Sequence, residues 1–168
     1  QLIDIYQARE ALEAMACRLA AERMSAEEIR GLRELLAAHA ELGEVRAGRG
    51  YFQAEGDLAF HERIARGSGN SIIQQILCED LYHLMRMYRY KFSGFQGRPH
   101  RALDEHQRVV TALEERDGEF AALLMRRHIS GARQRVEAAY RRARAGEDTH
   151  GGARAGGASG TDASRSTS

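Results

Sequence analysis

The sequence predicts an all-α protein, an antiparallel bundle of about six helices. Two observations support this fold class. Apolar residues recur every three or four positions along most of the chain, and no segment alternates apolar and polar residues as a half-buried strand would. Short breaks such as Gly67-Ser68-Gly69-Asn70 and Asp117-Gly118 separate the periodic segments. We therefore expect consecutive helices to fold back on one another.

Three helices are expected in the first part of the chain. The first covers residues 4–23, with an apolar stripe that includes Ile5, Leu12 and Met15. Ser25 and Glu28 form a capping-box pattern, which predicts that the second helix begins at this serine. Glycines at both ends of residues 43–50 indicate a loop, and the third helix is expected at about 51–66.

Three more helices are expected after the glycine-rich break. The fourth covers about residues 71–92, with Ile72, Leu77 and Leu81 on its apolar stripe, and residues 93–99 form a loop. The fifth is expected at 101–116. The sixth follows Asp117-Gly118 and ends near residue 143. Residues 144–168 contain no large apolar side chain, so they are expected to be a disordered Gly/Ala/Ser-rich tail.

The composition indicates one helical domain, residues 1–143, followed by that tail. Of 168 residues, 43% are hydrophobic and 29% charged, and the net charge of +1 gives no electrostatic footprint for nucleic acid or an anionic membrane. No run of about 18 apolar residues predicts a membrane span. Cys17 and Cys78 lie far apart inside helical patterns, which suits a reducing cytoplasm. The chain opens at Gln1 on a helical pattern, so we expect it to be a fragment.

Four residues carry the functional prediction: Asp57, His61, His106 and His128. The first two are four residues apart and share one helix face, and each later histidine lies on the apolar side of its own helix. Neutral imidazole is the commonest transition-metal ligand, and a carboxylate adds charge compensation. If the four meet, they form an interior site for a divalent transition metal. Zinc is the ion we expect, and nickel, manganese or iron would also fit.

Two other interpretations stay open at this point. The histidines could be ordinary hydrogen-bonded core residues of an interaction bundle without a metal. Alternatively, the protein could be a metal-dependent helix-bundle enzyme of the thiol transferase or hydrolase type. Glu105 is the candidate base for such an enzyme, but its position next to His106 on a helix points its side chain about 100° away.

Four local patterns together give a family resemblance over about residues 5–140. They are Gln7-Ala8-Arg9-Glu10-Ala11-Leu12-Glu13; Asp57-Leu58-Ala59-Phe60-His61 followed by Ser68-Gly69-Asn70; Glu105-His106 followed by Ala112 and Asp117; and Met125-Arg126-Arg127-His128-Ile129. In order and spacing they resemble the C-terminal effector-binding domain (FCD) of GntR-type bacterial transcription regulators of the FadR group.

The resemblance implies a helical bundle with a central cavity, in which Asp57, His61, His106 and His128 hold the metal. It also implies a non-catalytic sensor of a small organic acid, and a homodimer. Operator DNA would be bound by a winged helix-turn-helix domain that precedes this fragment and is absent from it.

The resemblance also implies further effector-binding residues. Arg9 would face the cavity and clamp the effector's carboxylate, although a surface salt bridge from Arg9 to Glu13 is the alternative. Asn70 is a second candidate, with helix capping as its main expected role. Arg86 is a third candidate, on the fourth helix.

Overall fold

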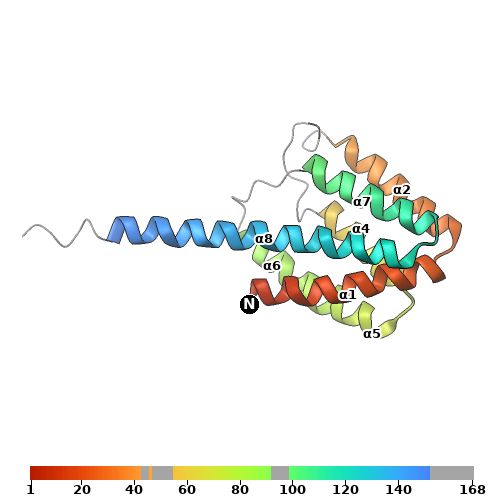
Figure 1. Ribbon diagram of the computed structural model, residues 1–168, viewed down its shortest axis with the longest axis horizontal. Helices are drawn as coiled ribbons and strands as arrows, with labels where there is room; N and C mark the ends of the chain where they lie inside the picture. The colour runs from red at the N-terminus through yellow and green to blue at the C-terminus, as the bar shows by residue number, and fades with distance from the viewer. Residues whose placement is uncertain (43–45, 47–54, 92–98, 152–168) are drawn as a thin grey trace, which may run out of the picture.

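The computed structural model describes residues 1–42, 46, 55–91 and 99–151. It confirms the all-α bundle (Figure 1). The helices are α1 (Leu2–Arg23), α2 (Ala26–Ala40), α4 (Glu55–Gly67), α5 (Ser71–Gln74), the π-helix η1 (Gln75–Leu81), α6 (Tyr82–Lys91), α7 (Pro99–Glu114) and α8 (Gly118–Gly151). The central cavity stays a prediction.

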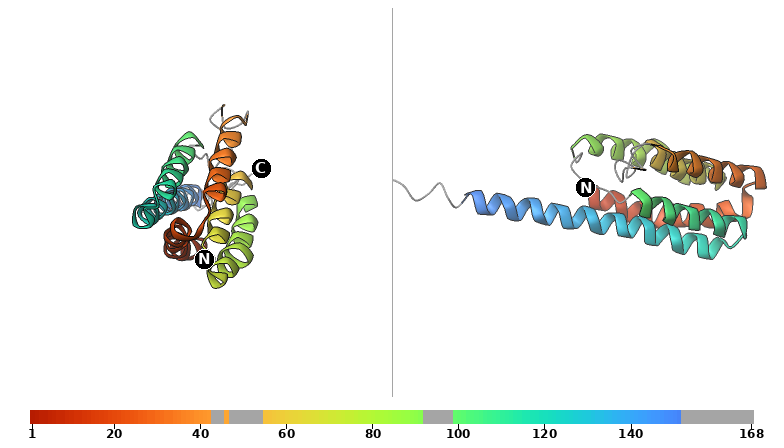
Figure 2. Two further views of the ribbon diagram at one scale, coloured as in Figure 1. Left: turned by 90° about the vertical axis from the view of Figure 1, so that its right-hand side faces the viewer. Right: turned by 90° about the horizontal axis from the view of Figure 1, so that it is seen from above.

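The helices are arranged in two layers, which the view from above shows most clearly (Figure 2). One layer holds α1, α7 and α8, and the other holds α2, α4 and the segment from α5 to α6. Buried apolar side chains from both layers form one continuous core. None of the described helices combines the length and hydropathy needed to cross a membrane.

The helix boundaries follow local signals that the sequence predicted. Ser25 Oγ accepts a hydrogen bond from the Glu28 backbone N–H, and Glu28 Oε2 accepts one from the Ser25 N–H, so the capping box that opens α2 is confirmed. Gly69 has a φ of +60°, a left-handed conformation that favours glycine, in the break between α4 and α5. The sequence therefore fixes where the chain reverses after α4.

The predicted fourth helix is interrupted by a π-helical segment that changes which residues face the core. Residues five apart share a face in a π-helix, so Leu77 and Tyr82 are both fully buried. In a regular α-helix Leu81, four residues after Leu77, would share the same buried face, as the apolar stripe predicted. In the structure Leu81 is only partly buried. The prediction that Ile72 faces inward is wrong, because its side chain is 62% exposed.

The last helix is longer than predicted. α8 continues to Gly151, past the expected end near residue 143, and its blue end extends beyond the bundle in Figure 1. Arginine and alanine at positions 142–145 favour helix, and the single interior glycine at 146 costs only about 1 kcal/mol. Residues 152–168 of the predicted tail lie outside the described residues.

Gly118, at the start of α8, lies so close to α1 that a larger residue would not fit there without a shift of the backbone. A Cβ atom at Gly118 would lie 2.9 Å from the backbone oxygen of Arg18. We expect Gly118→Ala to lower the free energy of unfolding by about 1–3 kcal/mol, because the two backbones must separate. Chemical denaturation of the purified chain measures this change.

Gly31 provides the matched control for this substitution. It lies inside α2, and a Cβ there would meet its nearest atom at 3.8 Å, an ordinary contact. Gly31→Ala should therefore raise the free energy of unfolding by about 0.5–1 kcal/mol, since alanine loses less backbone entropy in a helix. Equal effects of the two substitutions would show that α1 and α8 are not in close contact.

Candidate metal and effector site

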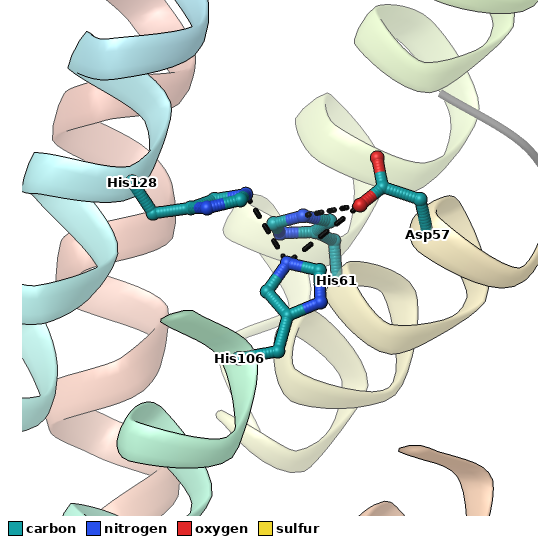
Figure 3. Close-up of side chains that lie close together, drawn as sticks. All are labelled: Asp57, His61, His106 and His128. Carbon is teal, nitrogen blue, oxygen red and sulfur yellow. Dashed lines mark hydrogen bonds and ion pairs between the residues drawn. The ribbon is translucent and has the colours of Figure 1, made fainter. Parts of the chain in front are cut away.

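Three helices bring the four predicted ligands together inside the bundle. Asp57 and His61 come from α4, His106 from α7 and His128 from α8, and their side chains point toward one another (Figure 3). All four are buried, and each offers a ligand atom within 4.8 Å of the others. The ring of His106 stacks on Phe60 at 4.1 Å between centroids, which fixes the imidazole from the core side.

The spacing of these atoms fits one shared metal ion. His106 Nε2 lies 3.1 Å from His128 Nε2, and Asp57 Oδ1 lies 3.6 Å from His106 Nε2 and 3.9 Å from His61 Nε2 (Figure 3). Ligand atoms that are each about 2.0–2.2 Å from one ion lie roughly 3–4.4 Å apart. The widest spacing of 4.8 Å therefore needs only a small adjustment of the side chains.

Two of the imidazoles, those of His61 and His128, each have their own carboxylate neighbour. In both cases it lies next to Nδ1, the ring nitrogen on the side away from the other ligands. His61 Nδ1 is 2.5 Å from Glu13 Oε2, and His128 Nδ1 is hydrogen-bonded to Glu105 Oε2 at 2.7 Å. A carboxylate partner keeps the proton on Nδ1, so the Nε2 lone pair is directed at the metal position. Glu13 and Glu105 are thus placed beside the Nδ1 atoms of His61 and His128, where they could orient the two rings.

The two carboxylates are themselves held in the ionised form. Burial alone would raise the pKa of Glu13, but Arg9 and His61 outweigh it and lower the pKa to about 2. Glu105 is also partly desolvated, yet hydrogen bonds from His128 and Arg101 lower its pKa to about 2. Both acceptors are therefore charged at neutral pH and available to the imidazole N–H groups.

The imidazoles of His106 and His128 are held neutral. Burial, and then the neighbouring histidines, lower the pKa of His106 well below its ordinary value. Burial also lowers the pKa of His128, although its hydrogen bond to Glu105 acts in the opposite direction. Neutral imidazole is the form that binds a metal, so the site needs no deprotonation of these two rings at neutral pH.

Arg9 is buried, which makes the prediction of a surface salt bridge wrong in its location. The pairing itself is present, because Arg9 Nε lies 2.5 Å from Glu13 Oε1 and both side chains are almost fully buried. The guanidinium carbon lies 5.4 Å from the Tyr6 ring centroid and 5.6 Å from that of Tyr82. Arg9 Nη2 is buried and makes no hydrogen bond to any described residue, so it can donate to a ligand.

Of the other two predicted effector residues, the structure describes the side chain of Asn70 and not that of Arg86. Asn70 caps α5, with its Oδ1 accepting from the backbone N–H groups of Ile72 and Ile73. It follows the C-terminal end of α4, whereas Asp57 lies near the N-terminal end. Arg86 belongs to α6, but its side chain is outside the part of the chain that the structure describes.

The sequence did not identify Glu13 as part of this site. Its spacing of four from Arg9 is typical of an exposed pair, and only the burial of both side chains reveals its second contact with His61. For Glu105 the sequence suggested only the role of a base. Its side chain does point away from His106, as the helix geometry predicted, and it contacts His128 instead.

Comparison with known proteins adds the family context. The family model described as FCD domain matches residues 4–131. Among solved structures, the fold is similar to that of Streptococcus agalactiae GntR, with a TM-score of 0.64 and 22% sequence identity. The match covers 79% of this chain and 58% of that chain, so the present chain spans little more than half of that protein's length. No curated protein gives a significant sequence match.

Proposed function

The chain belongs to the FCD domain family, and we propose that it is the ligand-sensing domain of a GntR-type bacterial transcription regulator. Asp57, His61, His106 and His128 would hold a divalent transition metal, and a small organic acid would bind to it as the effector. Zinc is the expected ion, with nickel, manganese and iron as alternatives.

The observation that carries this proposal is the donor set itself. Three imidazoles and one carboxylate converge from three helices, and a charged carboxylate lies within 2.7 Å of the Nδ1 atom of two of the imidazoles. Four protein ligands leave one or two positions open on a five- or six-coordinate ion. Such positions suit the carboxylate and hydroxyl oxygens of an organic acid. A bundle that used these histidines only as core residues would not need this arrangement.

Arg9 is the proposed partner of the effector's carboxylate. Its Nε is occupied by Glu13, whereas its buried Nη2 still lacks a hydrogen bond within the described residues. A guanidinium between two tyrosine rings is preorganised, so little side-chain entropy is lost when it binds an anion. Effector contacts from Asn70 and Arg86 stay predictions.

Effector binding would be transmitted by a shift between two arrangements of the bundle. A ligand can cause such a shift only by binding one arrangement better than the other. In the regulator that we propose, which would be a cytoplasmic homodimer, this shift would change how a winged helix-turn-helix domain fits operator DNA. Ligands from three different helices make the relative position of α4, α7 and α8 sensitive to what is bound.

An enzymatic role is disfavoured by the state of its candidate base. Glu105 already accepts hydrogen bonds from His128 and from Arg101, and these lower its pKa to about 2. A general base works best with a pKa near the operating pH. We therefore propose that the bound acid is sensed and released unchanged.

Calorimetric titration of the purified chain with small carboxylates, before and after removal of metal by a chelator, tests the proposed function. We expect at least one acid to bind the metal-loaded chain and to lose most of its affinity after chelation. Proton NMR of the recovered acid should show no chemical change. Binding that is unaffected by chelation would show that the metal takes no part in effector binding. Chemical conversion of the acid would favour the enzyme alternative.

A further inference from the structure

The π-helical segment turns a tyrosine toward the interior that an α-helix would direct elsewhere. Tyr82 follows η1 directly and comes five residues after the buried Leu77. In an α-helix, with about 3.6 residues per turn, five residues correspond to a rotation of about 140° away from Leu77. The wider turns of a π-helix reduce this rotation, and Tyr82 is 0% exposed. Such turns are rare and are found frequently at functional sites, which makes Tyr82 a candidate functional residue.

The ring of Tyr82 lies beside Arg9, next to the proposed metal site. The guanidinium carbon of Arg9 is 5.6 Å from the centroid of the Tyr82 ring. Arg9 Nε in turn lies 2.5 Å from Glu13 Oε1, and Glu13 Oε2 lies 2.5 Å from His61 Nδ1. A continuous series of contacts therefore leads from Tyr82 through Arg9 and Glu13 to one of the proposed metal ligands.

The hydroxyl of Tyr82 is buried, yet it has no hydrogen-bond partner among the described residues. Such a group is costly, because it has lost its hydrogen bonds to water and gained none from the protein. Arg9 Nη2 is in the same state. The ring of Tyr6 also lies beside Arg9, at 5.4 Å, but its hydroxyl is not left in this way. Two unsatisfied buried donors on neighbouring side chains indicate a small polar subsite for a ligand with oxygen acceptors.

The surroundings of the hydroxyl decide which kind of group it would bind. Burial raises the pKa of Tyr82 well above its ordinary value, and the nearby carboxylate of Glu13 raises it further. The phenol therefore keeps its proton at neutral pH and can donate a hydrogen bond. The two oxygens of Glu13 are already in contact with Arg9 and His61. A ligand carboxylate beside Arg9 would accept from Nη2 and from the phenol, each at about 2.7–3.0 Å.

We propose that Tyr82 is an effector-binding residue, whose hydroxyl donates a hydrogen bond to the same carboxylate that Arg9 binds. This inference rests on the proposed function, because it takes the effector to be an organic acid held at the metal site. Arg9 belongs to α1 and Tyr82 to α6, and these helices lie in different layers of the bundle (Figure 2). The bound effector would thus link the two layers directly, in addition to its contact with the metal.

Removal of this hydroxyl alone tests the proposal. The zinc-loaded chain and its Tyr82→Phe variant are titrated by calorimetry with formate, acetate, glycolate, lactate, malate and citrate. Each acid that binds the unmodified chain should bind the variant about 10- to 100-fold more weakly, as expected for loss of a hydrogen bond to a charged group. The unfolding midpoint of the zinc-loaded variant without acid should be unchanged or higher, because the lost hydroxyl has no partner among the described residues.

Two further variants show whether the effect belongs to the shared carboxylate. Tyr140→Phe removes the same group from a partly buried tyrosine of α8, and it should leave every affinity unchanged. Arg9→Lys keeps the charge beside Glu13 but loses the forked geometry of the guanidinium. If Arg9 and Tyr82 bind one carboxylate, the double variant should lose less affinity than the product of the two single losses. Zinc content and the helical circular dichroism signal should be the same in all variants.

The outcomes distinguish this inference from the proposed function. A loss of less than about tenfold in Tyr82→Phe overturns the role of Tyr82 and leaves a metal-dependent sensor. A lower unfolding midpoint of that variant without acid also overturns it, because the hydroxyl would then be a structural donor to Glu13. If none of the six acids binds the zinc-loaded chain, both the sensor of small organic acids and the role of Tyr82 are rejected.

Discussion

Replacement of His106 by alanine is expected to remove the metal while leaving the bundle folded. His106 is fully buried, and its Nε2 lies close to both Asp57 and His128, at the centre of the ligand group. Metal affinity should fall by more than the roughly 100-fold that loss of an outer hydrogen-bond partner costs. The cavity left by the imidazole should lower the free energy of unfolding by about 1–3 kcal/mol. Inductively coupled plasma mass spectrometry of chelator-free protein measures the metal content.

His83→Ala is the matched control for this experiment. His83 is an exposed histidine of α6, so its removal should leave about one metal per chain and an unchanged stability. If His106→Ala retains the metal content of the unmodified chain, the assignment of the site is wrong.

Replacement of Arg9 by methionine is expected to destabilise the fold more than any surface substitution. The change keeps most of the side-chain volume but leaves the Glu13 carboxylate buried without its guanidinium partner. Removing one member of a buried ion pair costs about 3–5 kcal/mol. Denaturation in the presence of a chelator isolates this effect from metal binding.

The exposed pair Glu62 and Arg66 has the same spacing of four and serves as the control. Arg66→Met should cost no more than about 1 kcal/mol, because an exposed pair contributes little. The double variant Arg9→Met/Glu13→Leu should recover most of the stability, since a buried pair can be replaced by packed apolar residues. A cost for Arg9→Met as small as that for Arg66→Met would mean that this pair is exposed in solution.

Much of the fold could be predicted because its breaks and caps are local. The Ser25–Glu28 capping box and the Gly69 turn depend on a few neighbouring residues, and the structure has each where the sequence indicated it. The apolar periodicity also identified every helix that the structure describes, apart from the π-helical segment. Local patterns of this kind depend little on what the helix later packs against.

The faces of two helices could not be predicted, because tertiary contacts override local patterns there. The apolar stripe predicts that Met15 of α1 faces inward, but Met15 is 42% exposed, and Arg9 and Glu13 occupy the buried face instead. Because Arg9 and Glu13 are charged, an apolar pattern predicts that both lie on the surface. In the core, however, each neutralises the charge of the other. The π-helical turn that buries Tyr82 likewise has no signal in the apolar pattern.

The four candidate ligands could be predicted, whereas their supporting residues could not. Asp57 and His61 are four apart on one helix, and the histidines of α7 and α8 lie on apolar faces, so their meeting was possible. The family resemblance implied that they would meet, and the structure brings them together. That they bind a metal stays a prediction. Glu13 belongs to the site only through the packing of α1 against α4, which no spacing in the sequence reveals.

A crystal structure of the metal-loaded chain, with anomalous data collected at the absorption edge of the bound metal, shows whether the four ligands hold the ion. We predict one anomalous peak per chain, about 2.0–2.2 Å from the Nε2 atoms of His61, His106 and His128 and from an Asp57 oxygen. A chain that takes up metal but shows the peak elsewhere, or that shows no peak and a direct hydrogen bond between His106 and His128, would contradict the metal-dependent sensor.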